Sequence, residues 1–153
     1  MGYTHYWTSN GSHAPLPQSA LDTIKGVLQP AYQAGIIQRE YDDSRPPLIT
    51  ATEIRFNGVG EQGHETFCFD SREDSLHGFC KTNQKPYDEL VMKVLLILAY
   101  YRPGLTLNSD GIFAQEWLEA IEWFNRVVDR AYVEQRIHFP RPAPSQAQAS
   151  SSA

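Results

Sequence analysis

A nearly continuous apolar run extends from Leu90 to Tyr101 and is interrupted only by Lys93. A helix that is apolar on almost every side is typical of the interior of a folded domain. The run is too short to span a bilayer, which takes about 20 apolar residues. We therefore expect a central core helix that starts at Pro86 and carries Asp88 and Glu89 in its first turn.

Two further helices and several strands follow from the spacing of the other apolar positions. A first helix is expected from Pro17, and Pro30 should kink or end it. A last helix is expected from about Phe113 to Tyr132, with Trp123 near its polar side. Strands are expected at about 3–7, 36–41, 48–57, 64–70, 78–80 and 105–107. This order predicts an α+β fold in which a mixed, mostly antiparallel sheet packs with two or three helices.

The opening strand carries large side chains on both of its faces. Tyr3, His5 and Trp7 point to one side, and Thr4 and Tyr6 point to the other. Side chains of this size on both faces suggest an interior strand that is covered on each side.

Length and composition predict one globular domain and a tail. Residues 1–138 are expected to form the single α+β domain, and residues 139–153, rich in Pro, Ser, Ala and Gln, to be disordered. The net charge of −5 argues against a protein that coats polymeric nucleic acid. No apolar segment follows a basic N-terminal region, so we expect a cytoplasmic protein with no membrane partner.

The start of the central helix has an unusual cap. Lys85 stands where Ser, Thr, Asp or Asn would accept the unpaired N–H groups, and lysine has no acceptor. Water, Thr82 or Asn83 could satisfy these groups, with Lys81 and Lys85 simply solvated. Alternatively, a phosphate-like anion fills the cap position, held by N–H groups and by the two ammonium groups. The sequence leaves both interpretations open.

Other residues would complete a nucleotide site if they gather beside these lysines. Aromatic rings stack on nucleobases, although burial in the core is the simpler role for them. Side chains that combine donors and acceptors could bind the base edge or a ribose hydroxyl. The candidate ligand-binding residues are Tyr3, His5, Trp7, Asn57, His64, Lys81, Thr82, Lys85, Tyr87 and Asp110.

Motifs for catalysis or for a cofactor are weak. The spacing Gly58-x-Gly60-x-x-Gly63 joins two expected strands, which indicates a hairpin loop or a flap rather than a dinucleotide fingerprint. His5, His64, Glu65 and Asp110 match no metal signature. We see no spacing typical of Ser-His-Asp or Cys-His catalysis, and Cys68 and Cys80 form neither a disulfide framework nor a zinc pattern. No catalytic residue, metal or cofactor is expected.

Six short blocks of the sequence resemble an uncharacterised family of small phage and prophage proteins that begin Met-Gly-Tyr-Thr-His-Tyr. The likeness covers about residues 1–125 and departs at Asn83-Gln84, where a small residue followed by a basic one is more usual. It implies a viral accessory protein of the kind that counters host defence. The blocks are Met1–Trp7, Phe56–Gly58, His64–Phe67, Phe79–Thr82, Lys85–Asp88 and Ser109–Gly111.

Together these features predict non-catalytic binding of a small anionic, nucleotide-like ligand. The resemblance extends this to a phage protein that acts as a sponge for a host immune signalling nucleotide. One alternative is a phosphoester-cleaving enzyme with His64 as base and Lys81 as charge stabiliser. Another is a protein-binding inhibitor whose surface includes Trp123. The sequence leaves open whether the chain forms a homo-oligomer.

Overall fold

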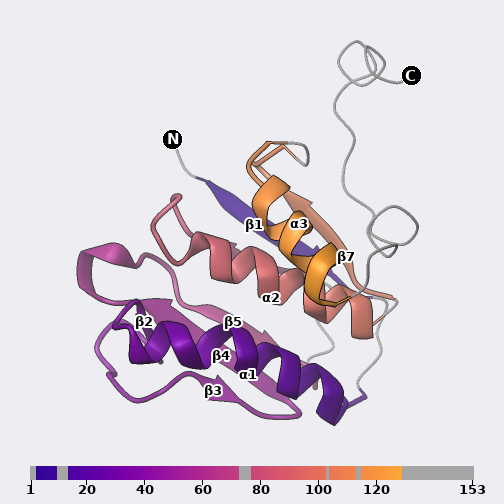
Figure 1. Cartoon of the computed structure of the whole chain (residues 1–153), viewed down its shortest axis with the longest axis horizontal. Helices are drawn as coiled ribbons and strands as arrows, with labels where there is room; N and C mark the ends of the chain where they lie inside the picture. Colours follow the sequence, from indigo (N-terminus) through magenta and orange to yellow (C-terminus); the bar gives the residue numbers. More distant parts are fainter. Residues whose placement is uncertain (1–2, 10–13, 73–76, 103, 113–114, 129–153) are drawn as a thin grey trace.

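A computed structural model describes residues 3–9, 14–72, 77–102, 104–112 and 115–128. Within these residues three helices pack with antiparallel sheets, which confirms the predicted α+β class (Figure 1). The elements in chain order are β1 (Thr4–Thr8), α1 (Gln18–Gln33), β2 (Ile37–Gln38), β3 (Leu48–Ile49), β4 (Glu53–Gly58), the 3-10 turn η1 (Gly60–Gln62), β5 (Phe67–Asp70), β6 (His77–Lys81), α2 (Asp88–Tyr101), β7 (Thr106–Ser109) and α3 (Leu118–Val127).

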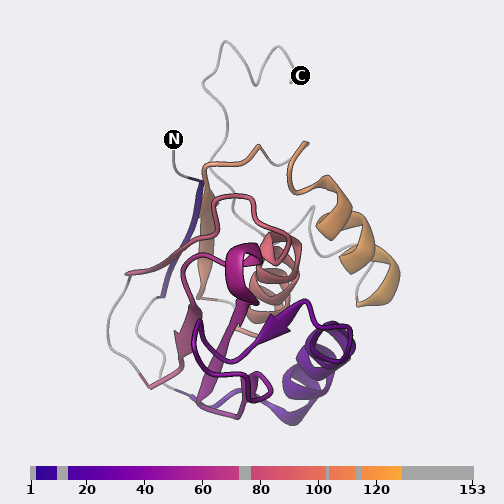
Figure 2. The same ribbon diagram turned by 90° about the vertical axis from the view of Figure 1, so that its left-hand side faces the viewer.

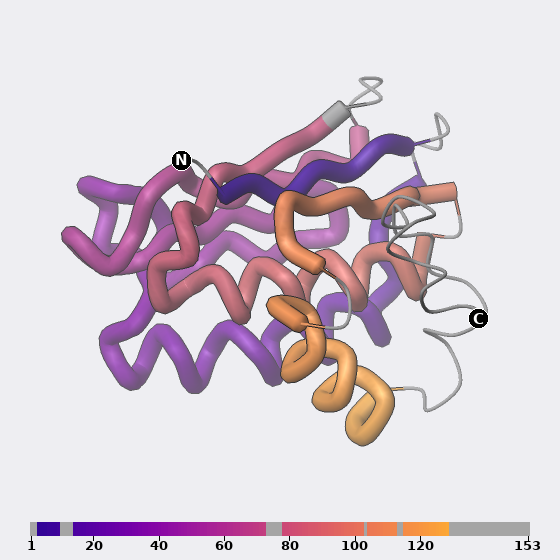
Figure 3. Tube along the Cα trace, turned by 90° about the horizontal axis from the view of Figure 1, so that it is seen from above, coloured from indigo at the N-terminus to yellow at the C-terminus, as the bar shows by residue number. Residues whose placement is uncertain are grey.

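The strands form two neighbouring sheets. In the first, β1 lies between β6 and β7 (Figure 3). His5 lies opposite both Cys80 on β6 and Ser109 on β7. In the second, β4 pairs with β2, β3 and β5. Backbone bonds link the segment before β5 to β6, because Glu65 N donates to Lys81 O at 3.2 Å. Every pairing between the described strands is antiparallel. The sequence had predicted a mixed, mostly antiparallel sheet, so the parallel part of that prediction is not found among the described strands.

The helices gather on one side of the strands (Figure 2). Helix α2 packs against both α1 and α3. Its side chains at Leu95, Leu96 and Leu98 are 0% exposed, which confirms the predicted central helix. Neighbours on several sides explain why this helix is apolar all round. No helix in the described part of the chain has both the length and the apolar character needed to cross a membrane.

The start of α2 differs from the prediction. The helix begins at Asp88, so Tyr87 occupies the N-cap position and no side chain caps it. Two successive turns precede it, closed by Lys85 N donating to Thr82 O at 3.0 Å and Asp88 N donating to Lys85 O at 2.8 Å. These turns place Lys85 and Pro86 outside the helix, which corrects the expected first position at Pro86.

The predicted strand at 48–57 is in fact the two strands β3 and β4. Thr50 Oγ1 accepts the backbone N–H groups of Thr52 at 3.3 Å and Glu53 at 3.0 Å. A hydroxyl that captures two nearby N–H groups favours a turn over a continuous strand. The glycine-rich segment after β4 forms the predicted loop between strands, and β5 starts only at Phe67, so His64 lies before it.

The outer helices are shorter or longer at their ends than expected. Helix α1 continues through Pro30 and ends at Gln33, three positions later. Helix α3 begins at Leu118 rather than near residue 113. Its predicted continuation to residue 132, the domain boundary at residue 138 and the tail at 139–153 lie outside the described residues.

Candidate functional site

A buried polar network joins β1, β7 and α2. His5 Nε2 lies 2.6 Å from Asp88 Oδ1, and His5 Nδ1 lies 2.8 Å from Ser109 Oγ. The Thr82 hydroxyl donates to the same Asp88 oxygen. His5 is 0% exposed, and its ring meets the ring of Trp117 edge to face at 5.1 Å. The network therefore replaces water for polar groups that the core would otherwise leave unpaired.

This arrangement has the order Ser109–His5–Asp88, which the sequence spacing did not suggest. With a carboxylate at Asp88, a neutral His5 would donate from Nε2 and accept the Ser109 hydroxyl proton at Nδ1. However, Ser109 Oγ also accepts the N–H of Gly111 at 2.8 Å. The Gly111 N–H is thus occupied by the Ser109 hydroxyl, and His5 is buried in the core. The geometry is that of a structural tie between β1, β7 and α2.

Tyr3 lies at the edge of this network. Its ring meets His5 edge to face at 5.2 Å, and only 9% of the residue is exposed. Burial raises the pKa of the Tyr3 hydroxyl, and the nearby Asp88 and Glu116 carboxylates raise that pKa further. A Cβ at Gly111 would overlap the Tyr3 hydroxyl. Tyr3 is therefore a core residue that requires a glycine beside it.

Asn57 holds the loop between β4 and β5. Its amide nitrogen donates to His64 O at 3.0 Å and Thr66 Oγ1 at 3.1 Å. Its Oδ1 accepts the N–H groups of Gly58 at 2.7 Å and His64 at 3.2 Å. All four hydrogen-bonding positions of this amide are used within the loop. The expected ligand contact at Asn57 is thus occupied by backbone and side-chain partners, while His64 is exposed.

The other two aromatic candidates are also in the core. Tyr87 is 0% exposed, and its hydroxyl donates to Glu65 O. Trp7 is 6% exposed and packs so closely on Gly78 that a Cβ there would overlap the indole. The structure therefore removes Tyr3, Trp7 and Tyr87 from the set of rings that could stack on a ligand.

Exposed aromatic rings lie instead on the outer face of the first sheet. Tyr6 is 40% exposed and Phe79 is 61% exposed, and the two residues are direct partners across β1 and β6. Asn108 pairs with Tyr6 on the other side and is exposed. The face is open at Tyr6 and Phe79, although Thr4 on the same face is buried, so the expectation that β1 is covered on each side is wrong at Tyr6. The alternation predicted that Tyr6 and Trp7 lie on opposite faces of β1, but it could not reveal whether the face that carries Tyr6 is covered.

Lys81 and Asp110 flank Thr4 at one end of this outer face. Lys81 lies two positions beyond Phe79 on β6 and is half-buried. Its backbone N–H donates to Glu65 Oε1 at 2.8 Å. Asp110 is exposed, and its Oδ2 accepts the Thr4 N–H at 3.0 Å. The structure thus brings two of the predicted site residues, Lys81 and Asp110, to the same end of one sheet.

The remaining candidates lie apart from this face. Thr82 is fully buried and bonded to Asp88. Lys85 is half-buried in the turns that follow β6. Among the residues that the structure describes, no three His, Cys, Asp or Glu side chains are grouped to hold a metal ion. Comparison of the chain with protein-family models, with curated proteins and with solved structures gives no match.

Proposed function

We propose that the protein binds a small anionic, nucleotide-like ligand on the outer face of the β6-β1-β7 sheet. The observation that carries this proposal is the exposed pair Tyr6–Phe79, which lies in register on two adjacent strands beside Lys81. Neighbouring exposed rings on a sheet face are typical of a surface that a ligand or partner covers when it binds. Aromatic rings presented by neighbouring strands are a general platform for nucleobases.

The polar groups around the two rings suit the other parts of a nucleotide. Lys81 lies one pleat from Phe79, about 7 Å along the strand, and can bring its ammonium to a phosphate. Asn108 lies opposite Tyr6, and its amide nitrogen can donate to a base edge, while its Oδ1 accepts the Ser109 N–H at 2.7 Å. The face of the base, the edge of the base and the phosphate thus each have a chemically suitable partner on one surface.

The charge of the chain favours a small ligand over a polymer. Lys81 is accompanied at the same end of the face by the carboxylate of Asp110, and the net charge is −5. Polymeric nucleic acid needs a continuous basic track along its phosphates. The resemblance to phage proteins adds the finer proposal that the ligand is a host immune signalling nucleotide, which the protein sequesters.

Calorimetric titration tests this proposal. The probes are nucleoside mono- and triphosphates, cyclic dinucleotides and inorganic phosphate. For the probe that binds, Tyr6→Ala or Phe79→Ala should weaken binding roughly fivefold to 150-fold, because stacking contributes about 1–3 kcal/mol per base. Lys81→Ala should weaken it about tenfold to a hundredfold through loss of a charge-assisted bond.

Two matched controls lie elsewhere on the surface. Tyr41 is 70% exposed in the loop after β2, and Lys25 lies on α1. Tyr41→Ala and Lys25→Ala should bind as the wild type does. Equal affinity of the wild type and the three sheet-face variants would refute the proposed site.

The phosphoester-cleaving alternative predicts a different fate for the bound ligand. His64 precedes Glu65, whose side chain and backbone bond to the backbone of Lys81, so the two segments lie side by side. Chromatography of the ligand recovered after denaturation separates the two functions. An intact ligand supports sequestration, whereas a cleaved product that disappears in His64→Ala supports the enzyme.

A further inference from the structure

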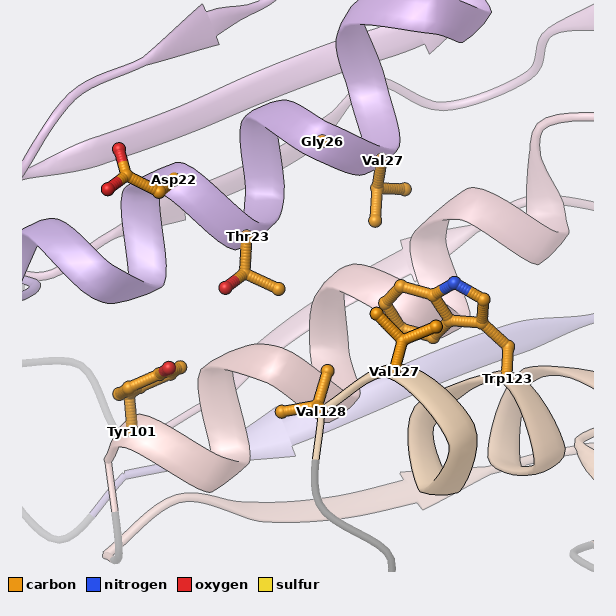
Figure 4. A pocket seen from close by; sticks show the side chains of 8 residues that line it. All are labelled: Asp22, Thr23, Gly26, Val27, Tyr101, Trp123, Val127 and Val128. Carbon is orange, nitrogen blue, oxygen red and sulfur yellow. The ribbon is translucent and has the colours of Figure 1, made fainter.

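A groove lies on the helical side of the molecule, away from the proposed nucleotide face. It has a volume of about 410 Å³ and is walled by α1 and α3, with the end of α2 between them (Figure 4). Most of its lining is apolar or aromatic, and Asp22 lies on its rim as an exposed carboxylate. The lining residues are Asp22, Thr23, Gly26, Val27, Tyr101, Trp123, Val127 and Val128.

The groove is open because α1 presents a glycine, and therefore no side chain, toward the side chains of α3 at this point. Gly26 faces it from α1 and has no neighbouring atom within 4 Å of the position that a Cβ would take. Val127 is 57% exposed and Trp123 is half-buried on the opposite wall. Lys93 Nζ lies 5.1 Å from the centroid of the Trp123 ring and covers part of it, so the exposed apolar strip of α3 centres on Val127.

The chain itself supplies a matching segment at this point. The described residues end at Val128, which lines the groove, and the chain continues from there. Segment 129–139 carries five apolar residues, interspersed with the basic residues Arg130 and Arg136 and the acidic residues Asp129 and Glu134. About ten residues can reach at most roughly 35 Å, more than enough to turn back over the groove. The apolar residues of the segment are Ala131, Tyr132, Val133, Ile137 and Phe139.

We propose that segment 129–139 of the same chain docks in the groove between α1 and α3. Its apolar side chains cover Val27, Trp123 and Val127, and an arginine of the segment pairs with Asp22 on the rim. Covalent attachment beside the groove gives the segment a high effective concentration, so modest contacts suffice to hold it. The composition changes to Pro, Ser, Ala and Gln after Phe139, which sets the end of the docked segment.

Hydrogen exchange of the full-length chain, followed by mass spectrometry, tests this docking. Peptides from 133–139 should exchange at least tenfold more slowly than peptides from 145–153. Residues 129–132 are left out of the comparison, because a continuation of α3 would protect them without docking. Rates in 133–139 as fast as those in 145–153 would overturn the proposal.

Gly26 provides a variant that blocks the groove and a matched control. Gly26→Trp should fill the groove and accelerate exchange of 133–139 about tenfold, whereas Gly26→Ala should leave it slow. Ile137→Asp should release the segment from the other side and make Trp123 more accessible to acrylamide, with no effect on the folded domain. Unchanged exchange in both Gly26→Trp and Ile137→Asp would show that the groove does not hold the segment.

Protein concentration separates the chain's own segment from a second copy. Docking within one chain predicts the same exchange rates at low and high concentration, with a monomer by light scattering. Protection that grows with concentration would assign the groove to a neighbouring copy and overturn the proposal.

Discussion

His5 Nε2 lies 2.6 Å from Asp88 Oδ1, and this contact fastens the first strand to the first turn of the central helix. Removing the imidazole leaves a buried carboxylate with the Thr82 hydroxyl as its remaining side-chain partner from this network. Breaking one side of a buried polar pair typically costs about 3–5 kcal/mol. We expect His5→Phe to lower the free energy of unfolding in urea by about this amount. His64→Phe, at an exposed position, serves as control, and a loss below about 1 kcal/mol in His5→Phe would contradict the role of the network.

Two glycines should respond in opposite ways to alanine. Gly78→Ala forces a Cβ into the buried Trp7 indole, and overpacking of this kind costs about 1–3 kcal/mol. Gly26→Ala adds a methyl group to open space inside α1 and should raise stability by roughly 0.5–1 kcal/mol through helix propensity. Thermal melts of the two variants provide the comparison, and equal shifts for both would contradict the packing at Trp7.

The two cysteines should differ strongly in reactivity. Burial raises the pKa of the Cys80 thiol to about 12, so almost none of it is thiolate at pH 8. Cys68 is exposed on β5. A disulfide reagent should therefore modify one thiol quickly in the native protein and two after unfolding. Cys68→Ser should abolish the fast reaction, and a fast reaction that persists in this variant would show that Cys80 is accessible.

Glu89 should make stability depend on pH. Burial raises the pKa of its carboxyl group above the ordinary value of 4.5, and the nearby Glu119 raises it further. The folded state therefore binds more protons than the unfolded state just above pH 4.5, so this carboxyl makes stability fall as pH rises through that range.

Glu89→Gln removes the titrating group, so the stability of the variant minus that of the wild type should increase from pH 4 to pH 6. Compared with the wild type, the variant should be relatively more stable at pH 7 than at pH 4, in spite of losing the ion pair with Lys93 at 3.6 Å. Thermal melts across this range, with the exposed Glu122→Gln as control, provide the measurement. A stability difference between variant and wild type that falls as pH rises would refute the assignment.

Local patterns predicted the parts of the fold that depend on neighbouring residues in the chain. The apolar run around Leu95 and Leu96 identified the central helix, because burial on all sides requires apolar residues on all sides. The alternation of Tyr3, His5 and Trp7 correctly predicted that these three buried side chains share one face of β1, although both faces were expected to be covered. The break at Thr50 was missed, since a hydroxyl that bonds nearby N–H groups leaves the hydrophobic pattern unchanged.

The candidate site depends on contacts that no local pattern contains. Ser109 reaches His5 only because β7 pairs with β1 in one particular register. Tyr6 and Phe79 are exposed because the described helices pack on the other face of the sheet, and a strand sequence does not specify on which sides helices pack. Lys81 was a candidate from the sequence, but the exposed rings of Tyr6 and Phe79 beside it could not be predicted.

The central place of β1 in its sheet has a consequence for biosynthesis. β1 is made first, but its partners are β6, which ends at Lys81, and β7, which ends at Ser109. On the ribosome, Tyr6 and Trp7 must therefore wait until most of the chain has emerged before they can pair. Pairings so distant in sequence are slow to form, and unpaired apolar strands are prone to aggregate in the meantime. The nascent chain should therefore depend on chaperones most strongly before residue 109 leaves the exit tunnel.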